Sequence, residues 1–199
     1  INIGSWQTYH VGTFSASATQ ARRFLIAKIG IDYNDWNSVG MFEVEIAEQY
    51  YYSGARRRYV VNYGYGGLNT IQLVEANGVG SDNADVIIEG PTQVSGDQYF
   101  LSVYVRVKYY STYTCLVRTT RSTTSSNPPG IGQTVIFTDP AAENIGDFSI
   151  NTTVYSTSGQ YGVAAPIYRD SDDTNYYVDP NGASKLNGLH IVSSGNQAS

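Results

Sequence analysis

The chain of 199 residues has little cysteine and no long apolar run, and each shortage excludes a class of protein. Cys115 is its single cysteine, so neither an intrachain disulfide nor a cysteine-rich zinc site can form. No apolar run approaches the about 18 residues of a membrane span, so we expect no membrane insertion. The chain opens at Ile1 rather than at methionine and ends in a polar tail, which indicates a fragment of a longer protein.

Charge is also scarce, at 15% of the residues, and the net charge is −5. A protein that binds phosphate backbones needs a basic face, so we expect no nucleic-acid partner. The abundant residues are instead 18 tyrosines and 20 glycines. Tyrosine, threonine, valine and isoleucine favour strands, whereas glycine, asparagine and serine favour turns. The composition therefore predicts an all-β protein.

Residues 41–65 predict the clearest β-hairpin. With Gly54 and Ala55 as a two-residue turn, the strands pair Tyr51 with Arg58 and Glu45 with Gly64. This register gathers mainly apolar side chains on one face and polar side chains on the other. We therefore expect an antiparallel sheet that covers a core with one face.

Further strands follow from the alternation of apolar and polar residues. Tyr99 to Lys108 and Thr112 to Arg118 alternate clearly, and residues 16–23 have a weakly helical pattern. Shorter strands are expected at residues 24–31, 70–75, 85–89 and 133–137, separated by turn signals such as Gly90-Pro91 and Ser95-Gly96-Asp97. Together these patterns predict an antiparallel β-sandwich bead over residues 1–155.

The sequence changes character near residue 156. Residues 156–199 are rich in turns and carry apolar side chains only singly or in pairs. Such a segment cannot cover its own apolar surface, so it must share a core with the preceding domain or with other chains.

A motif within this segment carries a resemblance to a known family. Tyr168 precedes an acidic stretch. The stretch is followed by a tyrosine pair, then by Asp179-Pro180-Asn181-Gly182, and then by Ser184-Lys185-Leu186-Asn187. The motif, residues 167–187, resembles the long tail fibre proteins of contractile-tailed bacteriophages. Arg169 and Asn175 are mild departures from the family pattern.

The resemblance implies a parallel homotrimer in which three chains wrap into an intertwined β shaft around a shared axial core. The side chains expected at this trimer interface are Tyr176, Val178, Leu186 and Leu189. Asp179, Pro180, Asn181 and Gly182 would form the shaft turn, because Pro180 presets its backbone angle and Gly182 accepts a positive φ. The other interpretation is a hairpin that packs on its own domain.

Residue patterns for catalysis or metal binding are weak. Asp170, Asp172, Asp173 and Asn175 resemble a calcium loop, but the sixth position is Asn175 and the twelfth is Asn181, where an EF-hand needs glycine and glutamate. A solvated acidic turn is therefore the better interpretation. Glu43 and Glu45 would lie about 7 Å apart on one strand face, a spacing that suits a glycosidase pair, but a solvated sheet face explains them as well. His10 and His190 form no metal motif. We therefore expect no catalytic residue, no metal and no cofactor.

The densest cluster for binding is the arginine run 56–58 beside the tyrosine run 50–52. Tyr51 and Arg58 could contact an acidic glycan, since a ring stacks on a sugar and a guanidinium grips a carboxylate. Trp36, in a polar loop, is a further candidate for this contact. The alternatives are a stabilised hairpin tip or subunit contact for the pair, and a core position for Trp36.

These features predict a structural, homotrimeric segment of a phage tail fibre, located in the virion and involved in host attachment. Its partners would be its own copies, adjoining fibre segments and possible host cell-surface glycan. A carbohydrate-binding receptor module is the alternative, and a tailspike-like glycan hydrolase is a third.

Overall fold

The computed structural model describes residues 5–17, 19–34, 40–49, 55–63, 69–77 and 83–150, with strand residues 168–169 and 177–178. The chain divides into two compact units, Ile1–Thr157 and Ser158–Ser199. The first unit is an antiparallel β-sandwich, as the alternation of apolar residues predicts. The described residues include no helix, and thus none that could span a membrane.

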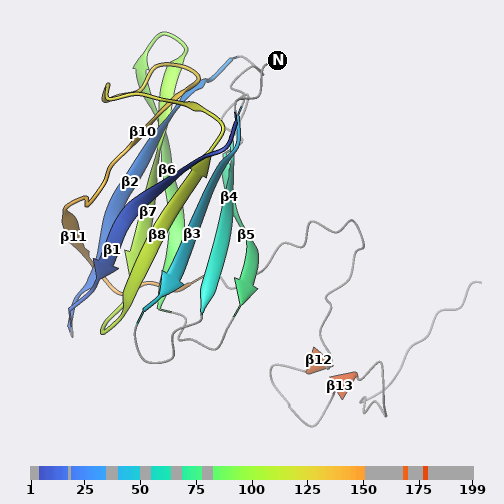
Figure 1. Ribbon diagram of the computed structural model, residues 1–199, viewed down its shortest axis with the longest axis vertical. Helices are drawn as coiled ribbons and strands as arrows, with labels where there is room; N and C mark the ends of the chain where they lie inside the picture. The colour runs from blue at the N-terminus through green and yellow to red at the C-terminus, as the bar shows by residue number, and fades with distance from the viewer. Residues whose placement is uncertain are drawn as a thin grey trace, which may run out of the picture. The chain divides into compact units, whose positions relative to one another are not determined.

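The first sheet has five strands in the order β1-β8-β3-β4-β5, and all neighbouring strands are antiparallel (Figure 1). Their bounds are Gln7–Ser15 for β1, Thr112–Thr119 for β8, Phe42–Glu48 for β3, Arg56–Asn62 for β4 and Thr70–Asn77 for β5. Strand β8 therefore inserts between β1 and β3, far from both in the sequence.

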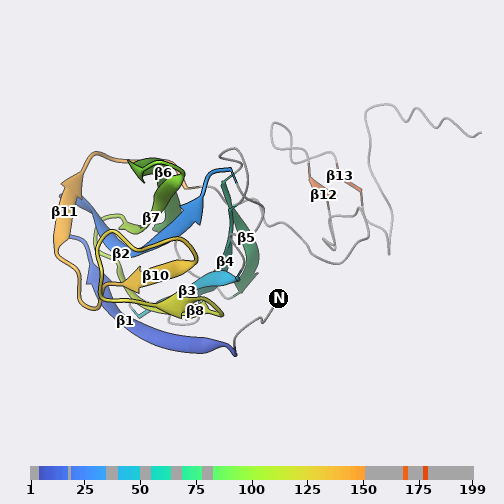
Figure 2. The ribbon, with the colours of Figure 1, turned by 90° about the horizontal axis from the view of Figure 1, so that it is seen from above.

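The second sheet has the order β6-β7-β2-β10-β9, and β11 also pairs with β2. The bounds are Ala84–Ser95 for β6, Gln98–Val107 for β7, Ala21–Asp32 for β2, Gln133–Ile136 for β10, Ser122–Thr123 for β9 and Ala142–Ile145 for β11. In the view from above, this sheet lies opposite the first one (Figure 2). The β9–β10 pair is parallel, and the other pairs of the sheet are antiparallel.

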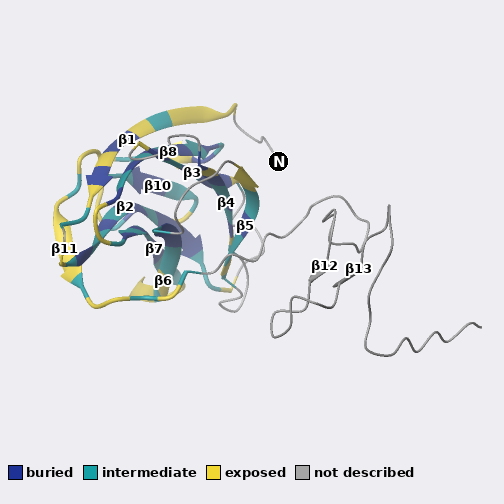
Figure 3. Cartoon of the chain, turned by 90° about the horizontal axis from the view of Figure 1, so that it is seen from below, coloured by how far each residue is buried: buried dark blue, intermediate teal, exposed yellow. Residues whose placement is uncertain are grey.

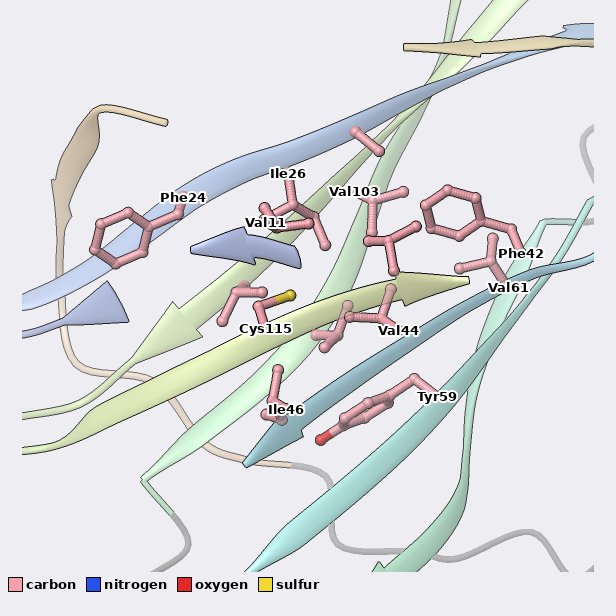
Figure 4. Packing of buried hydrophobic residues seen from close by; sticks show 14 of the residues in the cluster. Val11, Phe24, Ile26, Phe42, Val44, Ile46, Tyr59, Val61, Val103 and Cys115 are labelled. Carbon is pink, nitrogen blue, oxygen red and sulfur yellow. The ribbon is translucent and has the colours of Figure 1, made fainter. Parts of the chain in front are cut away.

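The core lies between the two sheets, and its side chains come from alternate positions of the strands (Figure 4). On β7, Leu101, Val103 and Val105 are fully buried, as their alternation predicts, and Cys115 of β8 faces them from the other sheet. Each fully buried aliphatic or aromatic side chain contributes about 1.5–3 kcal/mol. Figure 3 shows this inner layer of buried residues between more exposed outer faces.

The predicted hairpin register is wrong, although its faces are correct. Glu45 pairs with Arg58 instead of Gly64, which is a shift of six positions. The connection between β3 and β4 is longer than two residues, because β3 ends at Glu48 and β4 begins at Arg56. The Glu48 amide donates to the Ala55 carbonyl oxygen where the two strands meet this connection. Since side chains alternate with a period of two, an even shift leaves each strand with the same inner face.

Two local predictions are also wrong. The weakly helical stretch 16–23 instead leads into β2, because Ala21 and Phe24 are buried in the sandwich and this burial outweighs local propensity. The Gly90-Pro91 turn does not form, since β6 continues past it through an irregularity between Glu89 and Thr92. Proline fits there because β6 is an edge strand of the second sheet.

In the second unit, the structure describes β12, Tyr168–Arg169, and β13, Tyr177–Val178, as an antiparallel pair. Tyr168 pairs with Val178, and Arg169 pairs with Tyr177. The strand residues on either side of the acidic stretch in the fibre-like motif are therefore paired with each other. The expected interface residues Tyr176, Leu186 and Leu189 and the shaft turn 179–182 lie outside the described residues.

Candidate binding surface

Of the three predicted glycan contacts, the structure describes only Arg58. Trp36 and Tyr51 lie outside the described residues, and Arg58, in β4, pairs with Glu45 rather than with Tyr51. The segment containing Trp36 leads into the start of β3, and the segment containing Tyr51 follows its end. These segments therefore join the sandwich at opposite ends of one strand.

Arg58 lies on the outer face of the first sheet and is held by two carboxylates. Its Nε donates to Glu75 Oε2 at 3.1 Å, and its Nη1 lies 3.6 Å from Glu43 Oε2. The Arg58 side chain is 34% exposed. Its guanidinium is thus engaged within the sheet rather than held out toward a ligand.

Neighbouring strands extend this arrangement into a network. Arg56 donates to Glu75 at 2.7 Å and lies 3.7 Å from Glu45, which also accepts from Arg118 at 3.2 Å. The hydrogen bond between Arg56 and Glu75 raises the pKa of Arg56 and lowers the pKa of Glu75. Three carboxylates therefore face three guanidiniums. We call this set the charged lattice: Glu43, Glu45, Glu75, Arg56, Arg58 and Arg118.

The lattice corrects the expectation of a solvated face at Glu43 and Glu45. Both side chains point outward from β3, yet each is only 11% exposed, because the arginine side chains cover them. Their oxygens contact guanidiniums from β4 and β8. This arrangement gives no support to a hydrolytic acid pair.

The outer face of the second sheet also pairs its charges. Arg23, in β2, donates to Glu89 at 2.5 Å and to Glu143 at 2.7 Å, and its guanidinium stacks over the ring of Tyr104 at 4.6 Å. The hydrogen bond from Arg23 lowers the pKa of Glu143. Arg106 in turn forms two hydrogen bonds with Asp85, at 2.6 and 2.8 Å.

Phe148 completes this face beside the end of β7. Its ring lies 4.1 Å from the Arg106 guanidinium and 5.3 Å from the Lys108 ammonium. Asp147 lies 3.3 Å from that ammonium, and its pKa is lowered first by the Phe148 amide and then by Lys108. The cations named on both outer faces therefore have carboxylate partners within the chain.

The turn between β7 and β8 has a different character, because it exposes two adjacent aromatic rings. Tyr109 is 36% exposed and Tyr110 is 68% exposed. Tyr110 has a φ of 55°, in the left-handed region that costs a residue with a side chain about 1–2 kcal/mol. The signal in the sequence that could have indicated this pair is the position of two tyrosines between the alternating patterns of residues 99–108 and 112–118.

Among the described residues, no three histidine, cysteine, aspartate or glutamate side chains gather into a group that could hold a metal ion. In comparisons with known proteins, the chain matches no protein-family profile, no curated protein and no solved structure.

Proposed function

We propose that the chain is a structural segment of a phage tail fibre and works as a parallel homotrimer in the virion. The observation that carries this proposal is the motif at residues 167–187, a long match with a defined order of acidic, tyrosine and turn residues. The antiparallel pairing of Tyr168 with Val178 is consistent with a β-structured motif. The segment that follows residue 157 has too few apolar side chains to form a core alone.

The sandwich supports a spacer role for the first unit. Its core draws on both sheets, so this unit can fold without help from another chain. Its outer faces pair many of their charges within the chain, through the charged lattice and through pairs such as Arg106 with Asp85. A bead that pairs these charges within the chain can separate shaft segments.

Assembly tests the proposal directly. In light scattering, the full chain should have a mass of three times 21.8 kDa over a wide range of concentrations. A monomer throughout that range would contradict the fibre proposal.

The motif allows a sharper test. If Leu186 and Leu189 point into a core shared by three chains, the Leu186→Ala, Leu189→Ala double variant should lose about 2–5 kcal/mol per site. The trimer should dissociate while the sandwich keeps its strand content by circular dichroism. As a matched control, Leu116→Ala, on the outer face of β8, should leave the trimer mass unchanged.

A carbohydrate-binding module is the second candidate function, because the exposed tyrosines of the β7–β8 turn are a suitable contact surface. In this case the bead would contact host glycan while the shaft segment holds three copies together. The two functions are compatible, since avidity would strengthen a weak site that is repeated three times.

A further inference from the structure

We propose that the β7–β8 turn is a binding site for neutral carbohydrate, with Tyr109 and Tyr110 as the contact residues. The inference gives the second candidate function a site and a ligand class. It rests on the sandwich alone, so it does not depend on the trimer.

Exposure singles out this pair. Tyr110 is 68% exposed and Tyr109 is 36% exposed, on consecutive positions of one turn. The other described tyrosines are buried or half-buried: Tyr9, Tyr33, Tyr59, Tyr63, Tyr99, Tyr104 and Tyr113. Tyrosine combines a large apolar ring with a hydroxyl group, which suits it to surfaces that contact polar partners.

The backbone conformation of Tyr110 is a second, independent reason to assign a binding role to this turn. Tyr110 has a φ of 55°, and Gly96, in the hairpin turn between β6 and β7, has a φ of 50°. Glycine adopts this conformation at little cost, and it occupies the position in the β6–β7 turn. In the β7–β8 turn the same conformation is adopted by a tyrosine. A tyrosine kept in a strained position indicates that its side chain has a use.

Neighbouring groups fix the turn in place. The Lys108 amide donates to the Asn83 carbonyl oxygen at 2.6 Å, and the Ala16 amide donates to the Ser111 carbonyl oxygen at 3.2 Å. Ser111 is buried, and its hydroxyl donates to the Tyr109 carbonyl oxygen at 3.2 Å. The rings are therefore presented by a rigid backbone, which reduces the entropy lost on binding.

The surrounding charges define the ligand class. Lys108 is the nearest cation in the sequence, and it is occupied by Asp147 at 3.3 Å and by the ring of Phe148. With that charge neutralised, the turn offers ring faces and hydroxyls instead of a guanidinium fork. These groups fit the apolar C–H face and the hydroxyls of an uncharged hexose ring.

The experiment measures binding of the full chain to immobilised neutral hexose oligosaccharides, with uronic-acid oligosaccharides for comparison, at low and high salt. Neutral sugars should bind, and added salt should change this binding little. Tyr110→Gly should weaken it about tenfold or more, as loss of a stacked ring implies. The melting temperature of Tyr110→Gly should stay the same or rise, because glycine relieves the left-handed position.

Two further variants make the result specific. Tyr110→Phe keeps the ring and should bind within about threefold of the native chain. Trp6→Ala removes another exposed ring, since the Trp6 side chain is 47% exposed. Trp6 comes just before β1, whose first residue pairs with the last residue of β8, so it lies at the far end of β8 from the turn. This variant should bind sugar like the native chain.

The proposal fails if no neutral sugar binds at millimolar concentration, or if binding is confined to acidic sugars and disappears with salt. It fails equally if Tyr110→Gly binds like the native chain, or if Trp6→Ala is the variant that loses binding. Light scattering on the same samples separates the two ideas: a sugar-binding monomer would overturn only the fibre assembly, and a trimer without sugar binding would overturn only this site.

Discussion

The guanidinium of Arg121 lies over the ring of Tyr63, with its central carbon 4.7 Å from the ring centroid. Arg121 follows β8 of the first sheet, yet its side chain donates hydrogen bonds to three groups of the second sheet. Nε donates to the Thr134 hydroxyl at 3.1 Å, and Nη2 donates to the carbonyl oxygens of Gly30 and Gln133. This buried side chain therefore joins the two sheets.

Replacing Arg121 by lysine should destabilise the sandwich by about 2–3 kcal/mol, because an ammonium cannot reproduce the planar set of donors and leaves buried acceptors unpaired. Urea unfolding followed by circular dichroism measures this loss. Arg118→Lys, in the half-exposed charged lattice, is the matched control and should cost less than about 1 kcal/mol. Equal effects for the two variants would contradict the special role of Arg121.

Gly30→Ala should also destabilise the sandwich, by about 1–3 kcal/mol. A Cβ at Gly30 would lie 2.0 Å from the Gly130 carbonyl oxygen, so the loop crossing β2 would have to move. Gly146→Ala is the control, since no atom lies within 4 Å of its Cβ position, and it should change stability by less than about 0.5 kcal/mol. Thermal unfolding of both variants makes the comparison, and an unshifted midpoint for Gly30→Ala would show that the loop adapts freely.

Acid should weaken the folded chain. The pKa values of Glu75, Glu143 and Asp147 are lowered in the fold, in the first two cases chiefly by hydrogen bonds from Arg56 and Arg23. A carboxyl group whose pKa is lower when folded stabilises the fold above its unfolded pKa of about 4, and that contribution disappears as the pH falls through the folded pKa. The melting temperature should therefore be steady between about pH 7 and pH 5 and decline below about pH 4.

The slope of that decline identifies the groups responsible. A Glu75→Gln, Glu143→Gln double variant should melt lower than the native chain at neutral pH and lose less on acidification. Added salt should reduce the difference, because these exposed pairs are screened. A native chain whose stability increases below pH 4 would contradict the assignment.

Cys115 should be chemically silent in the native protein. The side chain is fully buried, and burial raises the pKa of its thiol, so little of the reactive thiolate is present or accessible. A thiol reagent at pH 8 should label the chain only in denaturant, with about one thiol per chain. Rapid labelling without denaturant would mean that β8 opens readily.

The strands were predictable from the sequence wherever apolar and polar residues alternate without interruption, as in β7 and around Cys115 in β8. Strand β1 was not, because an irregularity between His10 and Gly12 breaks the alternation that identifies a strand. The inner faces of β3 and β4 were correct while their register was not, since alternation does not report the length of the connecting loop.

The candidate sites were harder to predict, because their character depends on which strands become neighbours. The cationic appearance of the run 56–58 disappears once β5 brings Glu75 beside it and β3 brings Glu43 and Glu45. Those contacts follow from the sheet order, which no local pattern reports. Arg57 shows the same effect, because its Nη1 donates to the Ala84 carbonyl oxygen of the opposite sheet and becomes buried.

The placement of β1 and β11 has a mechanical consequence. The chain enters the sandwich through β1 and leaves it through β11, and both strands run opposite to β8 and β2, their antiparallel partners. The short connection 16–20 places the end of β1 and the start of β2 at one end of the sandwich, so entrance and exit lie at opposite ends. Tension between them acts along these strands, perpendicular to their hydrogen bonds. These hydrogen bonds would have to break together in shear rather than one after another. The arrangement therefore resists a force that pulls the two ends of the sandwich apart.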